Sequence, residues 1–416
     1  MLAHSPPFPI VIDHFRTGRL TRTGMTANDV EGIILALGHR DRVRRIRFRT
    51  RAHVTEKILV PIDGEFSMLE YMCIAPTHDT CIRFPKTFQA PQLRHLILVN
   101  FIYPIGSPPL STAMGLVGLA LVNIVPCSVY FQPNELLHRL SLLPQLETLW
   151  IGLEPSHYPD LRETHMHNAT HTSLPNLRFF QFRGFHVYSE ALLSRITAPH
   201  LEVVQVTFWT HRIFSAPCLL QFMSTSEDLR LGNAILLLST GGVRLSVYPN
   251  EMAKLSVFDM RVEGAMIFNA VQILNSLSPL FSSVVYLTLD RDDDLYSHSW
   301  PTPTDWRILL RSFNNVKILF VGDCVIQILA RFLQLDDEES PNDLLPELKE
   351  LTYFPTKHNA DAFAGFLDAR QNAGRPVTLV HLQNAASTPF RIRVQPSSLR
   401  IFQPVLSIDA GHGPPR

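Results

Sequence analysis

The chain has 416 residues, of which 46% are apolar and 18% are charged, and its 37 basic and 37 acidic residues leave a formal net charge of zero. This composition excludes general disorder, and the balanced charge excludes a global field that attracts nucleic acid or an anionic membrane. A single compact core rarely serves so long a chain, which predicts either two or three domains or a stack of repeats.

Five cysteines occur along the chain, and no two of them are spaced as Cys-x-x-Cys. An odd number without this spacing argues against a disulfide framework or a thiolate zinc site and favours a reducing compartment. The N-terminus lacks a charged segment followed by a long apolar stretch, so we expect no signal peptide. These features predict a cytoplasmic or nuclear protein.

The best candidate for a membrane span is Met114–Phe131, which Asn123, Pro126 and Ser128 interrupt. A span needs about 20 predominantly apolar residues. We therefore interpret this stretch as a buried strand and expect no membrane partner.

In chain order, we expect a lead-in strand and loop over residues 1–24, a repeat region over 25–384 and a C-terminal tail over 385–416. The repeat region is defined by a six-residue sequence motif, here called the phrase, which is long enough for one strand. The phrase has apolar residues at its first, fourth and sixth positions, as in Leu93–Leu98. Its spacing of about 24 to 32 residues is close to that of leucine-rich repeats, whose units stack on one elongated core. Copies begin near Val43, Leu69, Leu93, Leu116, Leu146, Leu177, Leu201, Met252, Val284, Val316, Leu348 and Val377.

Between these phrases lie stretches with apolar residues three and four positions apart, which is the period of an amphipathic helix. The first, Thr26–Leu37, begins with Thr26 and Asp29 at the spacing of a capping box. The other predicted helices are Asn134–Leu142, Ser189–Ile196, Ala265–Leu277, Thr304–Phe313, Cys324–Leu335 and Asp361–Asn372.

Alternation of strand and helix predicts an α/β fold, in the form of an irregular right-handed leucine-rich-repeat solenoid with a parallel concave β-sheet and outer helices. The gap between Leu201 and Met252 is long enough for one degenerate unit around Ala234–Val247. The middle apolar position of each phrase should be buried. Examples are Leu96, Leu149, Phe180 and Leu351.

Six stretches carry a further pattern: Asp41–Ile46, Phe88–Leu96, Leu174–Arg178, Trp306–Phe313, Leu344–Leu348 and, as the most specific, Asp368–Leu379. With them the chain resembles the leucine-rich region of a large family of fungal F-box proteins, from about Ile10 to Leu382. The resemblance implies the role of a substrate receptor beside a Skp1–cullin ubiquitin ligase.

In that family a compact helical F-box precedes the repeats, whereas the predicted strand Ile10–Ile12 begins almost at once here. We therefore expect no Skp1 binding from this chain alone. Two interpretations stay open: a substrate-recognition module linked to ubiquitination, and an F-box-less binding protein without a ligase link.

Every second residue of a strand points away from the core, which defines a predicted concave face that binds a protein partner. Trp150, Phe179 and Phe320 make this face aromatic, and exposed aromatic patches usually bind proteins. We expect Trp150 to be solvent-accessible and to lie beside Phe179; alternatively, a loop or the C-terminal tail covers the aromatic residues. The full set of candidates is Arg45, Arg47, Arg49, Tyr71, His95, Trp150, Phe179, Gln181, Arg183, Gln205, Tyr286 and Phe320.

The segment Arg40–Arg51 contains seven arginines and one acidic residue. One interpretation of the strip Arg45, Arg47 and Arg49 is a site for a phospholigand, a nucleic acid or an acidic partner. The other is a solvated first strand that its charge protects from edge-to-edge pairing. Since the rest of the chain is not basic, we favour the second interpretation and do not expect nucleic acid as a partner.

The sequence has no G-x-S-x-G motif, no glycine-rich phosphate loop and no H-E-x-x-H motif. We therefore predict a non-enzymatic protein without catalytic residues, cofactor or metal. The histidines over His157–His171 and the aspartates over Asp290–Asp294 are interpreted as polar loops, because neither has the ligand pattern of a known metal site.

Overall fold

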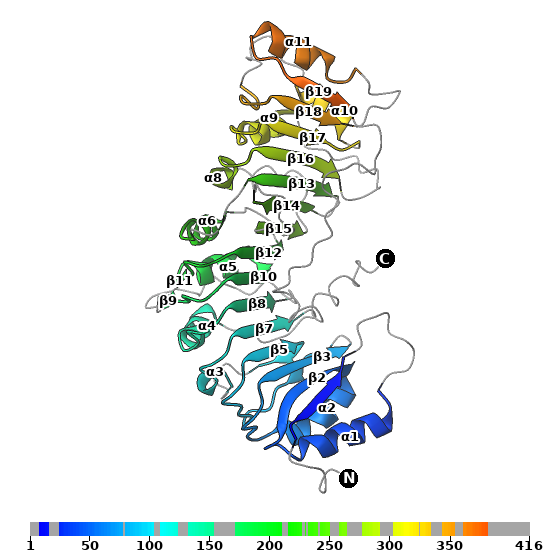
Figure 1. Ribbon diagram of the computed structural model, residues 1–416, viewed down its shortest axis with the longest axis vertical. Helices are drawn as coiled ribbons and strands as arrows, with labels where there is room; N and C mark the ends of the chain where they lie inside the picture. Colours follow the sequence, from blue (N-terminus) through cyan, green and yellow to red (C-terminus); the bar gives the residue numbers. More distant parts are fainter. Residues whose placement is uncertain are drawn as a thin grey trace. The chain divides into compact units, whose positions relative to one another are not determined.

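The computed structural model describes residues 8–15, 25–77, 80–103, 109–123, 132–153, 171–209, 215–226, 229, 232–239, 242–249, 258–263, 277–291, 303–323, 325–333, 343–353 and 361–381. The elements form two compact units, with the change between them at Glu202 and Val203. Figure 1 labels most of the elements of both units.

Unit 1 is built on parallel strands in the order β1-β2-β3-β5-β7-β8-β10. Their bounds are β1 Ile10–His14, β2 Val43–Arg51, β3 Tyr71–Thr77, β5 His95–Val99, β7 Gly118–Asn123, β8 Thr148–Leu153 and β10 Phe179–Phe185. Two short parallel pairs accompany them, β4 (Ile82–Arg83) with β6 (Phe101–Ile102) and β9 (Thr172–Ser173) with β11 (Ile196–Thr197). The predicted parallel sheet is confirmed for this unit.

The helices of unit 1 are α1 Ala27–Leu37, α2 Ala52–Leu59, α3 Pro109–Thr112, α4 Pro133–Leu140 and α5 His186–Leu193, with the 3-10 turn η2 at Val60–Ile62. In Figure 1, α3, α4 and α5 follow one another along one side of the strands. The predicted helices of this unit are confirmed, and α5 begins three residues earlier than expected. Helix α2 was not predicted; it follows β2 directly and buries Ile58 and Leu59.

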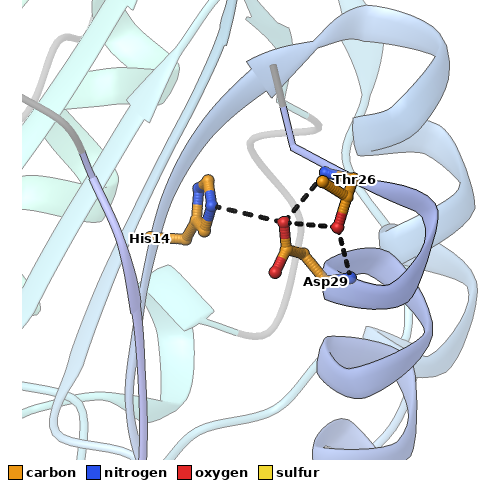
Figure 2. Close-up of polar contacts among 3 residues, drawn as sticks. All are labelled: His14, Thr26 and Asp29. Atoms are coloured by element: carbon orange, nitrogen blue, oxygen red, sulfur yellow. Dashed lines mark hydrogen bonds and ion pairs between the residues drawn. The ribbon is translucent and has the colours of Figure 1, made fainter. Parts of the chain in front are cut away.

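The capping box at the start of α1 is confirmed, and Figure 2 shows its contacts. The backbone N–H of Asp29 donates to Thr26 Oγ1 at 3.2 Å, and the backbone N–H of Thr26 donates to Asp29 Oδ2 at 2.8 Å. These bonds satisfy two backbone donors that the first helical turn leaves unpaired. His14 of β1 reaches the same carboxylate, with its Nε2 4.0 Å from Asp29 Oδ2.

One row of side chains forms the centre of the unit 1 core. The strand register places the middle apolar residues of successive phrases directly opposite one another, and all are fully buried. The row consists of Ile46, Met72, Leu96, Leu119, Leu149 and Phe180. In unit 2, Leu351 is fully buried as well, so the assigned phase of the phrase is confirmed.

Unit 2 has the strand order β12-β15-β14-β13-β16-β17-β18-β19. The strands are β12 Val203–Trp209, β13 Asn233–Ser239, β14 Gly242–Tyr248, β15 Phe258–Glu263, β16 Tyr286–Arg291, β17 Ile318–Val321, β18 Glu350–Tyr353 and β19 Thr378–His381. The helices are α6 Pro217–Ser224, α8 Ser278–Phe281, α9 Pro303–Arg311, α10 Ile326–Leu333 and α11 Ala364–Asn372. Helices α9, α10 and α11 confirm predictions, whereas the predicted helix Ala265–Leu277 lies, apart from its last residue, outside the described residues.

The predicted degenerate repeat at Ala234–Val247 is wrong. This segment is instead the hairpin β13–β14, whose strands pair antiparallel, and β14 also pairs antiparallel with β15. Only two residues connect Ser239 to Gly242, and so short a connection cannot make the crossover that parallel pairing requires. The phrase expected at Met252 lies outside the described residues, and the nearest strand after it begins at Phe258.

The most specific stretch of the F-box resemblance has a structural role at the end of unit 2. Arg370 of α11 is buried, and its Nη2 donates to the carbonyl oxygens of Pro346 at 3.3 Å and Leu348 at 3.2 Å. Arg375 Nη1 donates to the same Pro346 oxygen at 2.8 Å. Between these arginines, Gly374 adopts a φ of 74° as the chain leaves α11. The stretch therefore fastens α11 to the segment that leads into β18.

We predict that Leu149→Ala lowers the free energy of unfolding by about 2–5 kcal/mol, because it leaves a cavity in the core row. Chemical denaturation of both proteins measures the difference. Leu35→Ala serves as control, since Leu35 on α1 is 60% exposed and its loss should change stability little. Equal denaturation midpoints for the wild type and Leu149→Ala would contradict the assigned register.

Candidate functional site

The second face of the unit 1 sheet, defined as the face opposite the core row, carries candidate residues in aligned rows. The strand register places Arg45 opposite Tyr71 and Tyr71 opposite His95. The next row runs through Arg47, Cys73, Ile97, Ala120, Trp150 and Gln181. The fold thus places side chains from six strands next to one another on one face of the sheet.

The middle of the second face is a second apolar core. A cluster of fully buried residues fills it, and Phe15 and Tyr71 pack against the cluster. Its members are Cys73, Ala75, Ile97, Val99, Ala120, Val122 and Trp150. The packing is tight at Gly152, where an added Cβ would lie 2.8 Å from Val122 Cγ1.

The expectation that Trp150 is solvent-accessible is wrong, since its exposed fraction is 0%. Phe179 is also buried, and the residue opposite Trp150 on β10 is Gln181, whereas Phe179 lies opposite Thr148. Alternation along the strand identified the face correctly, but it does not tell whether a face is covered. In this conformation Trp150 stabilises the second face and offers no surface to a partner.

The arginine strip lies at one end of the apolar cluster. The Arg45 guanidinium carbon is 4.3 Å from the centre of the Tyr71 ring, and that of Arg47 is 4.6 Å from the centre of the Phe15 ring. Arg47 Nη1 lies 3.4 Å from Asp13 Oδ2. All three arginines of the strip are half-buried.

The interpretation of β2 as a charge-protected edge strand is wrong. Strand β1 pairs with β2 along Ile10–His14 on one side, and β3 pairs with it on the other. An interior strand does not need charge to prevent pairing with another molecule. The arginines are therefore not explained by protection of an edge.

Burial and the arginines shift the ionisation of this end of the face. Burial lowers the pKa of Arg49. Burial, and then the positive charges of Arg94 and Arg45, lower the pKa of His95 from its ordinary 6.5. Burial raises the pKa of Cys73 to about 12 and holds the pKa of Tyr71 above its usual range. His95 is therefore neutral near pH 7 and adds no charge to the strip.

The remaining candidates are not gathered with these. At the other end of the cluster, Gln181 and Arg183 are half-buried on β10. In unit 2, Gln205 is half-buried, Phe320 is buried, and Tyr286 is 38% exposed. Tyr286 is thus the one aromatic candidate that offers substantial surface.

Sequence reasoning missed an ion pair in the hairpin region of unit 2. Arg244 Nε and Nη2 donate to the two carboxylate oxygens of Asp259 at 3.1 and 2.9 Å, and Ser246 Oγ donates to Asp259 Oδ1 at 3.0 Å. The antiparallel pairing of β14 with β15 sets Ser246 opposite Asp259. No signal in the sequence joined these residues, because their proximity depends on the hairpin that was not predicted.

Within the described residues, no group of three His, Cys, Asp or Glu side chains is placed to hold a metal ion. His157–His167 and Asp292–Asp294 lie outside those residues. Likewise, no described helix is both long and apolar enough to cross a membrane.

Cys81 is disulfide-bonded, whereas the buried Cys73 is not. The expectation of a chain without disulfides is therefore wrong for Cys81. The prediction of a reducing compartment depended on unpaired cysteines, and it loses that support.

No family model matches the chain, and no curated protein matches it. Among solved structures, the chain is similar to one in the TLR13–ssRNA13 complex, with a TM-score of 0.31 and 14% sequence identity. The match covers 82% of this chain and 41% of the other, so this chain spans less than half the length of that structure. A TM-score of this size does not establish a common fold.

We predict that Trp150→Ala lowers the free energy of unfolding by about 3–5 kcal/mol, because the indole fills the apolar cluster of the second face. Chemical denaturation gives the difference, and Tyr286→Ala is the control, since an exposed ring contributes little to stability. If Trp150→Ala unfolds at the wild-type midpoint, the cluster is not a core.

We predict that His95 titrates below pH 6.5, and that Arg45→Gln moves its pKa back toward that value because one nearby positive charge is removed. A pH titration of the imidazole signals by NMR measures both values. Arg178→Gln is the control, since Arg178 pairs with Glu202 away from this site. A pKa for His95 at or above 6.5 would refute the assigned environment.

Proposed function

We propose that this chain is a leucine-rich-repeat solenoid that acts as a non-enzymatic scaffold for binding a protein partner. The observation that carries the proposal is the alignment of second-face side chains in rows across neighbouring strands. Parallel strands lie about 4.8 Å apart, so a row across six strands extends over roughly 24 Å. Because the middle of the row is buried, its half-buried ends, Arg47 and Gln181, are what a partner could contact, and a protein spans such a separation better than a small molecule does.

Strand β16 of unit 2 offers the aromatic residue with which such a scaffold would bind. Tyr286 is 38% exposed, and the register places it between Asn233 and Ile318. Tyrosine is enriched among the residues that dominate binding energy, since it offers a large apolar surface with a polar end. Tyr286 therefore replaces Trp150 as the candidate anchor.

For the biological role, we propose a substrate-recognition module linked to ubiquitination, and this link comes from the F-box resemblance alone. The competing proposal is a binding protein without a ligase link. The two differ in what happens to the partner, because a substrate of a ligase is degraded whereas the partner of a scaffold is only held.

We predict that Tyr286→Ala reduces capture of the partner at least tenfold, as expected for an interface residue that contributes about 1.4 kcal/mol or more. Affinity capture with quantitative mass spectrometry compares the wild type with the variant. Ile308→Ala is the matched control, because Ile308 on α9 is also 38% exposed but belongs to a helix. If no captured protein depends on Tyr286 more than on Ile308, the proposed anchor is wrong.

The same partner then separates the two roles. Depletion of this protein from the cells that express it should raise the half-life of the partner if the ligase link is correct, and should leave it unchanged if the chain is a scaffold alone. Purified Skp1 mixed with this chain tests the expectation that the chain alone does not bind it. Co-elution of the two proteins in equal amounts would overturn that expectation.

A further inference from the structure

The arginine strip breaks the usual rule for an interior strand. Arg45, Arg47 and Arg49 occupy alternate positions of β2, which pairs with β3 along Arg45–Arg51 and with β1 along Val43–Phe48. Charged side chains on such strands are normally paired, because burying a charge without a counter-charge is costly. Here the three guanidinium groups are half-buried on one face.

The counter-charge within the described part of the chain is insufficient. Asp13 is the carboxylate near the strip, and it lies 3.4 Å from Arg47. Among the described residues, neither Arg45 nor Arg49 forms an ion pair with a carboxylate. Three guanidinium groups and one carboxylate leave two positive charges uncompensated.

Hydrogen-bonding capacity is also left unused at the same place. The Nε atoms of Arg45 and Arg49 and the Nδ1 atom of His95 are buried and have no hydrogen-bond partner. A buried polar group without a partner costs about 1–3 kcal/mol. These atoms are themselves inaccessible, so an external anion would meet the other N–H donors of the half-buried Arg45 and Arg49 side chains.

The strip is held in place by aromatic contacts. The Tyr71 ring lies against the Arg45 guanidinium, and the Phe15 ring lies against that of Arg47. These contacts restrict the arginines without using their N–H donors. Binding of a ligand therefore costs these side chains little conformational entropy.

We propose that Arg45, Arg47 and Arg49, with Tyr71 and His95 beside them, form a binding site for a phosphorylated side chain of a protein partner. A phosphate monoester carries a charge of about −1.5 to −2 near neutral pH, which matches the two uncompensated charges. Its three oxygens accept hydrogen bonds, and guanidinium groups bind phosphate with two parallel N–H donors. The choice of a protein partner rests on the proposed function.

The dimensions of the strip favour a single phosphate over a nucleic acid backbone. Residues i and i+4 of a strand are about 13 Å apart, so the strip has room for one or two phosphate groups. Beyond it the face continues with the uncharged residues Cys73 and Ile97, and the whole chain carries no net positive charge. Nucleic-acid binding needs a longer basic surface.

The first experiment tests the anion site with inorganic phosphate as the probe. Phosphate at millimolar concentration should raise the melting temperature of the wild type by about 2 °C or more, relative to chloride at equal ionic strength. Arg49→Gln should abolish this rise, and in chloride it should melt no lower than the wild type, because no ion pair is lost. Arg44→Gln is the control, since Arg44 lies on the same strand but is exposed and pairs with Glu70 at 2.9 Å. An equal rise in all three proteins would overturn the site.

The second experiment tests the class of partner. Fluorescence anisotropy compares a degenerate peptide library with a central phosphothreonine, the same library with threonine, and a mixed-sequence single-stranded RNA. We expect the phosphorylated library to bind at least tenfold more tightly than the other two, and Arg49→Gln to weaken it at least tenfold while Arg44→Gln does not. Tighter binding of the RNA, or equal binding of both libraries, would overturn the protein partner. Because the Tyr286 variant reports on unit 2, failure of the scaffold proposal is distinguishable from failure of this site.

Discussion

The hydrogen-bonded register between parallel strands is the constraint on which the two faces of the unit 1 sheet depend. Because side chains alternate along a strand, the pairing that aligns Leu96, Leu119 and Leu149 on the core face also aligns Ile97, Ala120 and Trp150 on the other. A shift of one residue would exchange the two rows. The fully buried core row makes such a shift costly, and the geometry of the second face is therefore fixed by residues that do not lie on it.

The second face is divided by chemistry. Its centre is apolar and buried, so it contributes to stability, while the arginines at one end and Gln181 and Arg183 at the other are half-buried and polar. A partner that approached this face would contact the polar and charged side chains at its two ends, because the apolar centre is buried. Charged residues at the rim mainly influence the rate and selectivity of association, whereas buried aromatic residues dominate affinity. Under the proposed function, and with Trp150 buried, recognition in unit 1 would depend on its charged end.

Sequence patterns predicted the features that local spacing determines. The phrase predicted Leu149 and Phe180 as buried, and the spacing of Thr26 and Asp29 predicted the capping box. The hairpin of β13 and β14 was not predicted, because its apolar residues also fit a repeat and only the short connection at residues 240–241 excludes a crossover. The burial of Trp150 was not predictable either. The alternation of side chains along a strand shows on which face of the sheet a residue lies, but not whether other residues cover that face.

The arginine strip shows how a failed explanation directs attention to a site. Protection of an edge would have accounted for Arg45, Arg47 and Arg49 without any ligand, but it requires that β2 has a free side, and β1 occupies that side from Val43 to Phe48. Solvation does not replace it, because the side chains are half-buried and burial lowers the pKa of Arg49. Departures from the usual pairing of charged side chains on strands occur most often at binding sites. There the binding of a ligand offsets the loss of stability. An anionic group bound at the strip would supply the counter-charge that the described part of the chain does not provide.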